Sequence, residues 1–91
     1  MDIDLLANSI TYSQEEQDLL KWIKETGTTK IKFGQKVIIQ KIPFYIVGGT
    51  LKGNIYLQKF PTNTSKLHIR YDDSKPKIIV FHSLLNVFQK N

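Results

Sequence analysis

The stretch Lys66-Leu67-His68-Ile69-Arg70-Tyr71 alternates polar and apolar side chains, and this alternation sets the expected fold. Successive side chains of a β-strand point to opposite faces of the sheet. The three apolar residues would therefore face a core, while Lys66, His68 and Arg70 would line the opposite surface. The sequence predicts a strand with one cationic face at this position.

The segment that follows Thr28 has the same period of two. Its apolar and basic residues fall on opposite parities: Ile31, Phe33, Val37 and Ile39 against Lys30, Lys32 and Lys36. Two geometries preserve this pattern, a single strand bent at Gly34 or a hairpin with a loop over residues 34–36, and we favour the hairpin. Pro43 is expected to end the segment, because proline cannot donate a hydrogen bond within a central strand.

Three further apolar segments predict the rest of the sheet. Residues 44–51 and 55–60 form an expected hairpin across the turn Lys52-Gly53-Asn54. The pair Gly48-Gly49 suggests a bulge or sharp bend in the first of these strands. Residues 78–81 are apolar on both faces, which indicates a strand that is central or covered on both sides.

One helix is predicted before the sheet, over residues 14–26. Ser13-Gln14-Glu15-Glu16 matches a capping box, in which the Ser13 hydroxyl and the Glu16 carboxylate each accept a backbone hydrogen bond. Gly27 supplies the end of the helix. The apolar residues of this segment share one arc and should be buried on the sheet: Leu19, Leu20, Trp22 and Ile23.

These elements predict an α+β fold in a single domain of 91 residues. The amphipathic N-terminal helix packs on a sheet of four or five mainly antiparallel strands, open or closed into a small partial barrel. Residues 1–12 are expected to form a loosely ordered arm, residues 29–81 the sheet region, and residues 83–90 a short helix or a last strand.

The order of a helix followed by short strands, with Gly49-Thr50-Leu51-Lys52-Gly53 at a strand bend, resembles the Sm and Hfq RNA-binding barrels. Residues 80–85 are similar to the late Tyr-Lys-His segment of Hfq. The likeness implies a small barrel as the alternative to an open sheet. The Asp-to-Asn pattern that marks the Sm base pocket is absent after Gly53, so no residue role is carried over.

The charge is distributed unevenly along the chain. Residues 1–25 hold six acids against two lysines, a net charge of −4, whereas residues 26–91 hold eleven Lys or Arg against two acids, a net charge of +9. Such a domain should generate a positive potential over part of its surface. A positive field attracts nucleic acid, acidic protein surfaces or anionic membrane.

Several classes of protein are disfavoured by composition. No apolar run exceeds four residues, so no membrane span is expected, and Asp2 and Asp4 do not begin a secretory signal. The absence of cysteine fits a cytoplasmic protein and removes thiolate metal sites. His68 and His82 have no partner at metal-ligand spacing, so neither a metal nor a cofactor is expected.

The leading hypothesis is a small, basic, non-enzymatic protein that binds DNA or RNA through phosphate contacts. Outward cations would contact the phosphates, and Tyr56 would offer a stacking platform. The candidate nucleic-acid-binding residues are Lys30, Lys32, Lys36, Lys52, Tyr56, Lys66, His68 and Arg70.

Two alternatives stay open. The chain has the size and charge of a protein-interaction module or inhibitor, of the kind found in phages and viruses, that docks on an acidic partner protein. The third hypothesis is a metal-independent ribonuclease in which His68 moves a proton while Lys66 and Arg70 stabilise the phosphate. The oligomeric state, including a homodimer, is left open.

Overall fold

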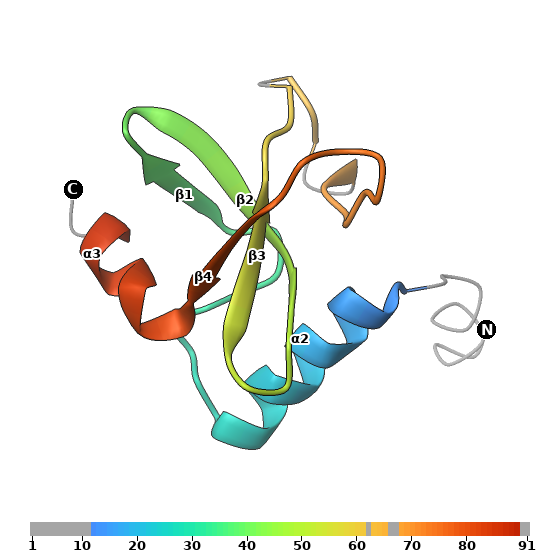
Figure 1. Ribbon diagram of the computed structural model, residues 1–91, viewed down its shortest axis with the longest axis vertical. Coiled ribbons are helices and arrows are strands. Elements are labelled where there is room, and N and C mark those ends of the chain that lie inside the picture. The colour runs from blue at the N-terminus through green and yellow to red at the C-terminus, as the bar shows by residue number, and fades with distance from the viewer. Residues whose placement is uncertain (1–11, 62, 66–67, 90–91) are drawn as a thin grey trace.

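The computed structural model describes residues 12–61, 63–65 and 68–89. It confirms the α+β fold, with a helix packed on a four-stranded antiparallel sheet that curves into half of a barrel (Figure 1). The strand order follows the sequence, β1-β2-β3-β4. The elements are α2 (Gln14–Thr26), β1 (Lys36–Ile39), β2 (Ile42–Gly49), β3 (Asn54–Gln58), β4 (Ile78–Phe81), the 3₁₀ turn η2 (His82–Leu84) and α3 (Leu85–Gln89). None of the helices in these described ranges could cross a membrane.

Helix α2 begins and ends where the sequence predicts. The Ser13 hydroxyl accepts a hydrogen bond from the Glu16 N–H at 3.2 Å, and the Ser13 N–H donates to Glu16 Oε1 at 2.8 Å. At the other end Gly27 has φ +67°, and its N–H donates to the Ile23 carbonyl at 2.9 Å. Both ends are therefore stabilised by local contacts, which is why the sequence locates them.

The buried stripe of α2 is narrower than predicted. Leu19 and Trp22 are buried in the core, and Ile23 is partly buried against it, but Leu20 is 40% exposed. The prediction that Leu20 is buried is wrong. It lies one residue after Leu19, about 100° farther round the helix, and the helix packs on the sheet along the line of Leu19 and Trp22.

The glycine pair in β2 permits this packing. A Cβ added at Gly48 would lie 2.9 Å from Glu15 Cβ, and one added at Gly49 would lie 2.5 Å from the Asn54 carbonyl oxygen. The predicted bulge is present, because the β2–β3 register shifts between Ile46 and Gly48. The helix and the neighbouring strand therefore approach β2 more closely than any side chain would allow.

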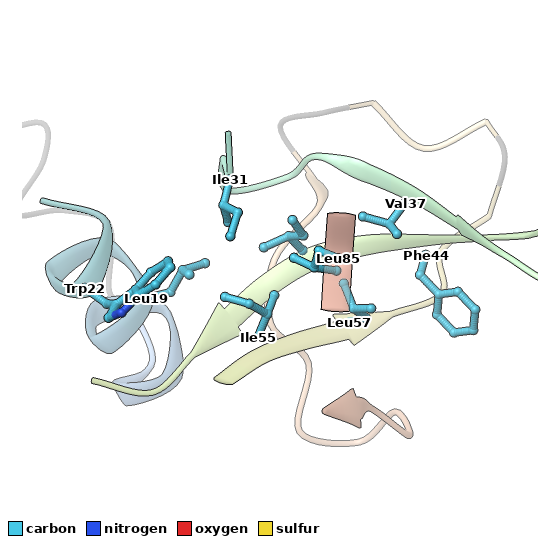
Figure 2. Close-up of a cluster of buried hydrophobic side chains, with 9 residues drawn as sticks. Leu19, Trp22, Ile31, Val37, Phe44, Ile55, Leu57 and Leu85 are labelled. Carbon is cyan, nitrogen blue, oxygen red and sulfur yellow. The ribbon is translucent and has the colours of Figure 1, made fainter. Parts of the chain in front are cut away.

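The core lies between the sheet and the two helices (Figure 2). Helices α2 and α3 and strands β1 to β3 contribute buried residues, and Val80 of β4 is partly buried against them. Helix α3 packs beside β1, so the C-terminal segment is a helix rather than a last strand. The buried cluster comprises Leu19, Trp22, Ile31, Val37, Phe44, Ile46, Ile55, Leu57 and Leu85.

The first hairpin turns at a different place from the prediction. Residues 30–35 are not a strand, and β1 and β2 are joined by Gln40 and Lys41, which have φ of +51° and +69°. Two residues with positive φ are the arrangement of a type I′ turn, whose twist matches that of the flanking strands. The expected loop over residues 34–36 is therefore wrong.

Gly34 instead forms a bulge that leads into β1. Its φ is +82°, and the Gln35 N–H donates to the Lys32 carbonyl at 3.1 Å, as in a type II turn. The Gly34 N–H donates to the Ile46 carbonyl at 2.7 Å, and the Ile46 N–H donates to the Gln35 carbonyl at 2.9 Å. Two residues thus oppose Ile46, which is a bulge with glycine in the left-handed position.

Pro43 lies inside β2 instead of ending the segment. It pairs with Ile38 in the β1–β2 ladder, while the β2–β3 register begins only at Tyr45. In an antiparallel ladder every second residue pair is hydrogen-bonded. The hydrogen bond from the Ile46 N–H to the Gln35 carbonyl determines which pairs these are, and Ile38–Pro43 is one of the pairs without hydrogen bonds. The proline nitrogen therefore faces a side of β2 where no described strand needs a donor.

Strand β4 is at the edge of the sheet, which contradicts the prediction of a central strand. It pairs with β3 alone among the described strands, and Ile78, Ile79 and Phe81 are all exposed. An apolar run shows that a strand can be buried on both faces, but it does not show that neighbours exist to bury it.

Leu19 and Leu20 provide a paired test of this packing. Leu19→Ala should lower the free energy of unfolding by about 2–5 kcal/mol, because it leaves a cavity in the core. Leu20→Ala should change it by less than about 1 kcal/mol, because Leu20 is 40% exposed and lies outside the buried core. Urea denaturation of the two variants measures both values, and equal losses would contradict the orientation of α2.

Candidate nucleic-acid interface

The described part of the segment predicted as a cationic strand, residues 68–71, does not join the sheet, so the predicted strand is wrong there. Residues 69–71 have no regular secondary structure, and His68 lies in a turn in which its N–H donates to the Ser65 carbonyl at 3.0 Å. Residues 66 and 67 lie outside the described ranges, so the placement of Lys66 is untested. The alternation still separates an exposed His68 from a buried Ile69.

The segment instead packs over the outer face of β3. Ile55 and Leu57 point into the core, so Tyr56 and Gln58 point to the opposite face. The Tyr71 ring lies 6.3 Å from that of Tyr56, centroid to centroid. Because β2 and β4 already pair with the two edges of β3, this segment cannot pair with β3 and instead covers its outer face.

Arg70 is held by a buried carboxylate and is not part of an open cationic row. Its Nε donates to Glu16 Oε2 at 3.0 Å and its Nη2 to Oε1 at 2.9 Å. The Tyr71 N–H also donates to Oε2, at 3.2 Å. Glu16 is 1% exposed, and the Arg70 guanidinium also lies 4.9 Å from the Tyr12 ring. Arg70 therefore has a structural role that fixes residues 70–71 to the start of α2.

The pKa of Glu16 reflects two opposed effects. Burial of the carboxylate acts to raise its pKa, but hydrogen bonds from Arg70, Ser13 and Tyr71 together lower it below the ordinary value. The same hydrogen bonds to Glu16 raise the pKa of Arg70. The pair is thus charged throughout the neutral range.

Two of the predicted lysines meet beside the first hairpin. Lys36 opens β1 opposite Tyr45, and Lys32 is the first residue of the turn before it. Together they line an open groove of about 360 Å³, which we call the hairpin groove: Lys32, Phe33, Gly34, Gln35, Lys36 and Tyr45. This groove is therefore lined by two lysines and by the aromatic residues Phe33 and Tyr45.

A second groove holds three lysines that the sequence analysis did not select. It has a volume of about 310 Å³ and is called here the three-lysine groove: Phe44, Lys59, Lys75, Pro76, Lys77 and Ile78. The cations come from positions flanking β3 and β4, where no alternation marks them. The basic pair around Pro76 was the one local signal that could have drawn attention to them.

Aromatic contacts join the two grooves. Tyr45, in the hairpin groove, packs edge-on against Phe60 with ring centroids 5.9 Å apart. The Nζ of Lys75, in the three-lysine groove, lies 4.3 Å from the centre of the Phe60 ring. We define the basic–aromatic surface as these connected residues: Lys32, Lys36, Tyr45, Phe60, Lys59, Lys75 and Lys77.

Gln58 positions the lysines at the far end of this surface. Its buried side chain donates to the carbonyls of Asp72 and Lys75, at 2.7 and 3.2 Å, and accepts from the Asp72 N–H at 2.9 Å. Within the turn, hydrogen bonds from the Ser74 hydroxyl and N–H lower the pKa of the Asp72 carboxyl. The turn is thereby fixed to the sheet, and Lys75 is held beside Phe60.

The other predicted residues lie apart from this surface or are already occupied. Lys30 is exposed in the bend after α2, and Lys52 is exposed in the β2–β3 loop. Tyr56 is covered by Lys77, whose Nζ lies 4.6 Å from the ring centre and donates to the Tyr71 hydroxyl at 2.9 Å. This hydrogen bond raises the pKa of Lys77. Of the predicted residues that the structure describes, Lys32 and Lys36 are the two that line one groove.

The two histidines lie in separate surroundings. The Nδ1 of His68 lies 2.7 Å from the Ser65 hydroxyl oxygen. The His82 ring packs between aromatic rings, with its centroid 5.0 Å from that of Trp22 and 4.4 Å from that of Phe81. Within the described part of the chain, no group of three His, Cys, Asp or Glu side chains could hold a metal ion. Every buried side-chain nitrogen or oxygen there has a hydrogen-bond partner.

Comparison of the chain with models of known families, with curated proteins and with solved structures found no match.

The Glu16–Arg70 pair predicts a specific acid sensitivity. A carboxylate with a lowered folded-state pKa stabilises the fold fully above its unfolded pKa of about 4.3, and this stability is lost as pH falls through the folded value. Glu16→Gln should cost about 1–3 kcal/mol at pH 7, because a charge-assisted network is broken. It should also flatten the fall in stability between about pH 5 and pH 2.

Urea denaturation as a function of pH measures both effects. Glu25→Gln, at the exposed end of the same helix, is the matched control and should keep the wild-type pH dependence. If Glu16→Gln retained the full acid dependence of the wild-type protein, the pair would not contribute in this way.

Proposed function

We propose that the protein binds single-stranded nucleic acid along the basic–aromatic surface. Lysines of the two grooves contact phosphates, and bases stack on the exposed parts of Tyr45 and Phe60. The observation that carries this proposal is the contact path from the hairpin groove through Tyr45 and Phe60 to Lys75. Alternating cations and aromatic rings are the recognition pattern of proteins that bind single strands without sequence preference.

The electrostatics of the surface support this proposal. Among the described residues, the one ion pair is that of Arg70 with Glu16, so no described lysine has a carboxylate within 4.0 Å. The sequence has no acid at all between Glu25 and Asp72. Lys32, Lys36 and Lys59 lie in this acid-free stretch, and Asp72 and Glu15 act on Lys75 and Lys77 without forming an ion pair, so phosphates can replace solvent around these lysines.

The aromatic residues favour a single strand over a duplex. Tyr45 and Phe60 are half-buried, so part of each ring is in solvent. In a duplex the faces of the bases are stacked on one another and cannot reach a ring on a protein surface, whereas unpaired bases can. Phosphate contacts alone would not distinguish the two.

The geometry supports the ribonuclease hypothesis less well. Arg70, which would have stabilised the phosphate, is bound to Glu16, and His68 lies beside Ser65 away from the two grooves. We therefore propose binding without catalysis.

The salt dependence of binding tests the lysine contacts. Each phosphate contact on a single strand contributes about −0.7 to the slope of log K against log[salt], so five lysines give about −3.5. Lys32→Ala combined with Lys36→Ala should reduce the magnitude of this slope by about 1.4. Fluorescence anisotropy with labelled single-stranded DNA and RNA, from about 50 to 200 mM salt, measures the slope.

Lys21→Ala combined with Lys24→Ala is the matched control, because it removes the same charge from the exposed side of α2. This control should leave the slope within error of the wild-type value. No detectable binding at low salt would overturn the proposal. Retention of an acidic protein from a nuclease-treated lysate would then favour the protein-interaction alternative.

The aromatic part of the proposal has its own test. Tyr45→Ala should weaken binding of single strands about 5- to 150-fold, the loss found when a stacking residue is removed. Tyr45→Phe keeps a ring of the same size and should bind within about twofold of wild type. The slope against log[salt] should be unchanged in both variants, since no cation is removed. Equal affinities for all three proteins would exclude stacking at Tyr45.

A further inference from the structure

The edge strand β4 exposes apolar side chains on both faces. Ile79 is 53% exposed and Phe81 44% exposed on the outer face, and Ile78 is exposed on the core side. No charged side chain occurs from residue 78 to residue 81. Edge strands normally carry lysine, proline or a bulge that prevents further pairing, and β4 has none of these.

The other edge of the sheet differs. Strand β1 begins with the exposed Lys36, and α3 packs against it. Strand β4 is the last in the strand order, and Figure 1 shows it leading directly into the C-terminal helical segment. The contrast identifies β4 as the one edge of the described sheet that is left unprotected.

The backbone of β4 is also available for pairing. The His82 N–H donates to the Gly53 carbonyl at 2.9 Å, and in an antiparallel ladder the bonded residues alternate. Ile78 and Val80 therefore bond to β3, and the N–H and C=O groups of Ile79 and Phe81 point to the free edge. No described strand pairs with this edge. The Phe81 carbonyl, at the N-cap of η2, accepts the first hydrogen bond of that turn with one of its two lone pairs, and the second is directed to the edge.

We propose that β4 pairs antiparallel with β4 of a second copy of this chain and joins the two sheets. Only residues whose backbone groups face the free edge can form the bonded pairs. The register that pairs both free-edge residues of each strand joins Ile79 to Phe81 of the second copy and places Val80 opposite Val80 at the two-fold axis. The cross-strand contact of an aromatic with a β-branched side chain is among the stabilising ones in sheets.

Charge favours a second copy in this orientation. Lys75 and Lys77 precede β4, so a parallel arrangement would place them against the same lysines of the partner strand. The antiparallel register places Lys77 opposite Ser83, and no like charges oppose each other. The contact is isologous, which is the commonest form of homodimer interface.

Further apolar surface follows β4 directly. Leu84 is exposed, and Val87, three residues later in the helical segment, is 63% exposed. Residues three apart lie on the same side of a helical turn. Four-residue strands by themselves bury little surface, whereas a stable interface needs more than about 1,000 Å². We infer that Leu84 and Val87 extend the interface on each side of the paired strands.

Sedimentation equilibrium tests the dimer over a range of about 5 to 500 µM protein, because self-association depends on concentration. The wild-type protein should change from monomer to dimer across this range. Ile79→Lys places a charge on the edge and should stay monomeric. Leu51→Lys, which adds the same charge at an exposed apolar residue of the β2–β3 loop, should dimerise like wild type. A wild-type protein that stays monomeric throughout would overturn the proposal, as would an Ile79→Lys variant that dimerises like wild type.

A cross-linking test is independent of whether Ile79→Lys folds. The chain has no cysteine, so Val80→Cys introduces a single thiol at the two-fold axis. Unbonded antiparallel pairs have Cα atoms about 4.5 Å apart, within the range that a disulfide spans. Under oxidation Val80→Cys should form a covalent dimer at least about tenfold faster than Leu51→Cys, because paired strands hold the thiols together. Equal rates would overturn the register. Neither experiment contains nucleic acid, so the inference stands or fails separately from the proposed function.

Discussion

The structure depends on one buried carboxylate. Glu16 belongs to the capping box of α2, so its position follows from the local sequence. The same carboxylate accepts two hydrogen bonds from Arg70 and one from the Tyr71 N–H, 54 and 55 residues away. A carboxylate in this position must be satisfied on every side, because an unpaired buried charge is strongly destabilising. The start of the helix and the segment over β3 are therefore fixed by a single side chain.

The basic–aromatic surface follows from this arrangement. With Arg70 and Tyr71 fixed, the chain passes over β3, and Gln58 holds the Asp72 and Lys75 carbonyls. Lys75 then lies on Phe60, and Lys77 lies on Tyr56 and Tyr71. Lys75 and Lys77 are thus held over rings by a segment that is hydrogen-bonded to the sheet. A preordered surface of this kind loses less conformational entropy on binding than free lysines would.

The open edge and the basic–aromatic surface adjoin each other. Lys77 lines the three-lysine groove and directly precedes β4. Ile78 lines the same groove and is the first residue of β4. Pairing of two β4 strands would therefore bring two such grooves into one assembly. Two linked sites on one strand of nucleic acid raise the effective concentration of the second contact.

The sequence by itself determined the features that rest on short-range contacts: the bounds of α2, the bulge beside Gly48, the α+β class and the excess of cations after residue 26. Capping and charge counts need only neighbouring residues. Tertiary structure decided the rest. Alternation correctly separated His68 from Ile69, but it could not show that Arg70 meets Glu16, since nothing local links residues 54 positions apart. Likewise, the apolar run of β4 was evident, but whether a neighbour covers it depends on strand order. Lys59, Lys75 and Lys77 became a cluster only because the fold brings the ends of β3 and β4 beside Phe44.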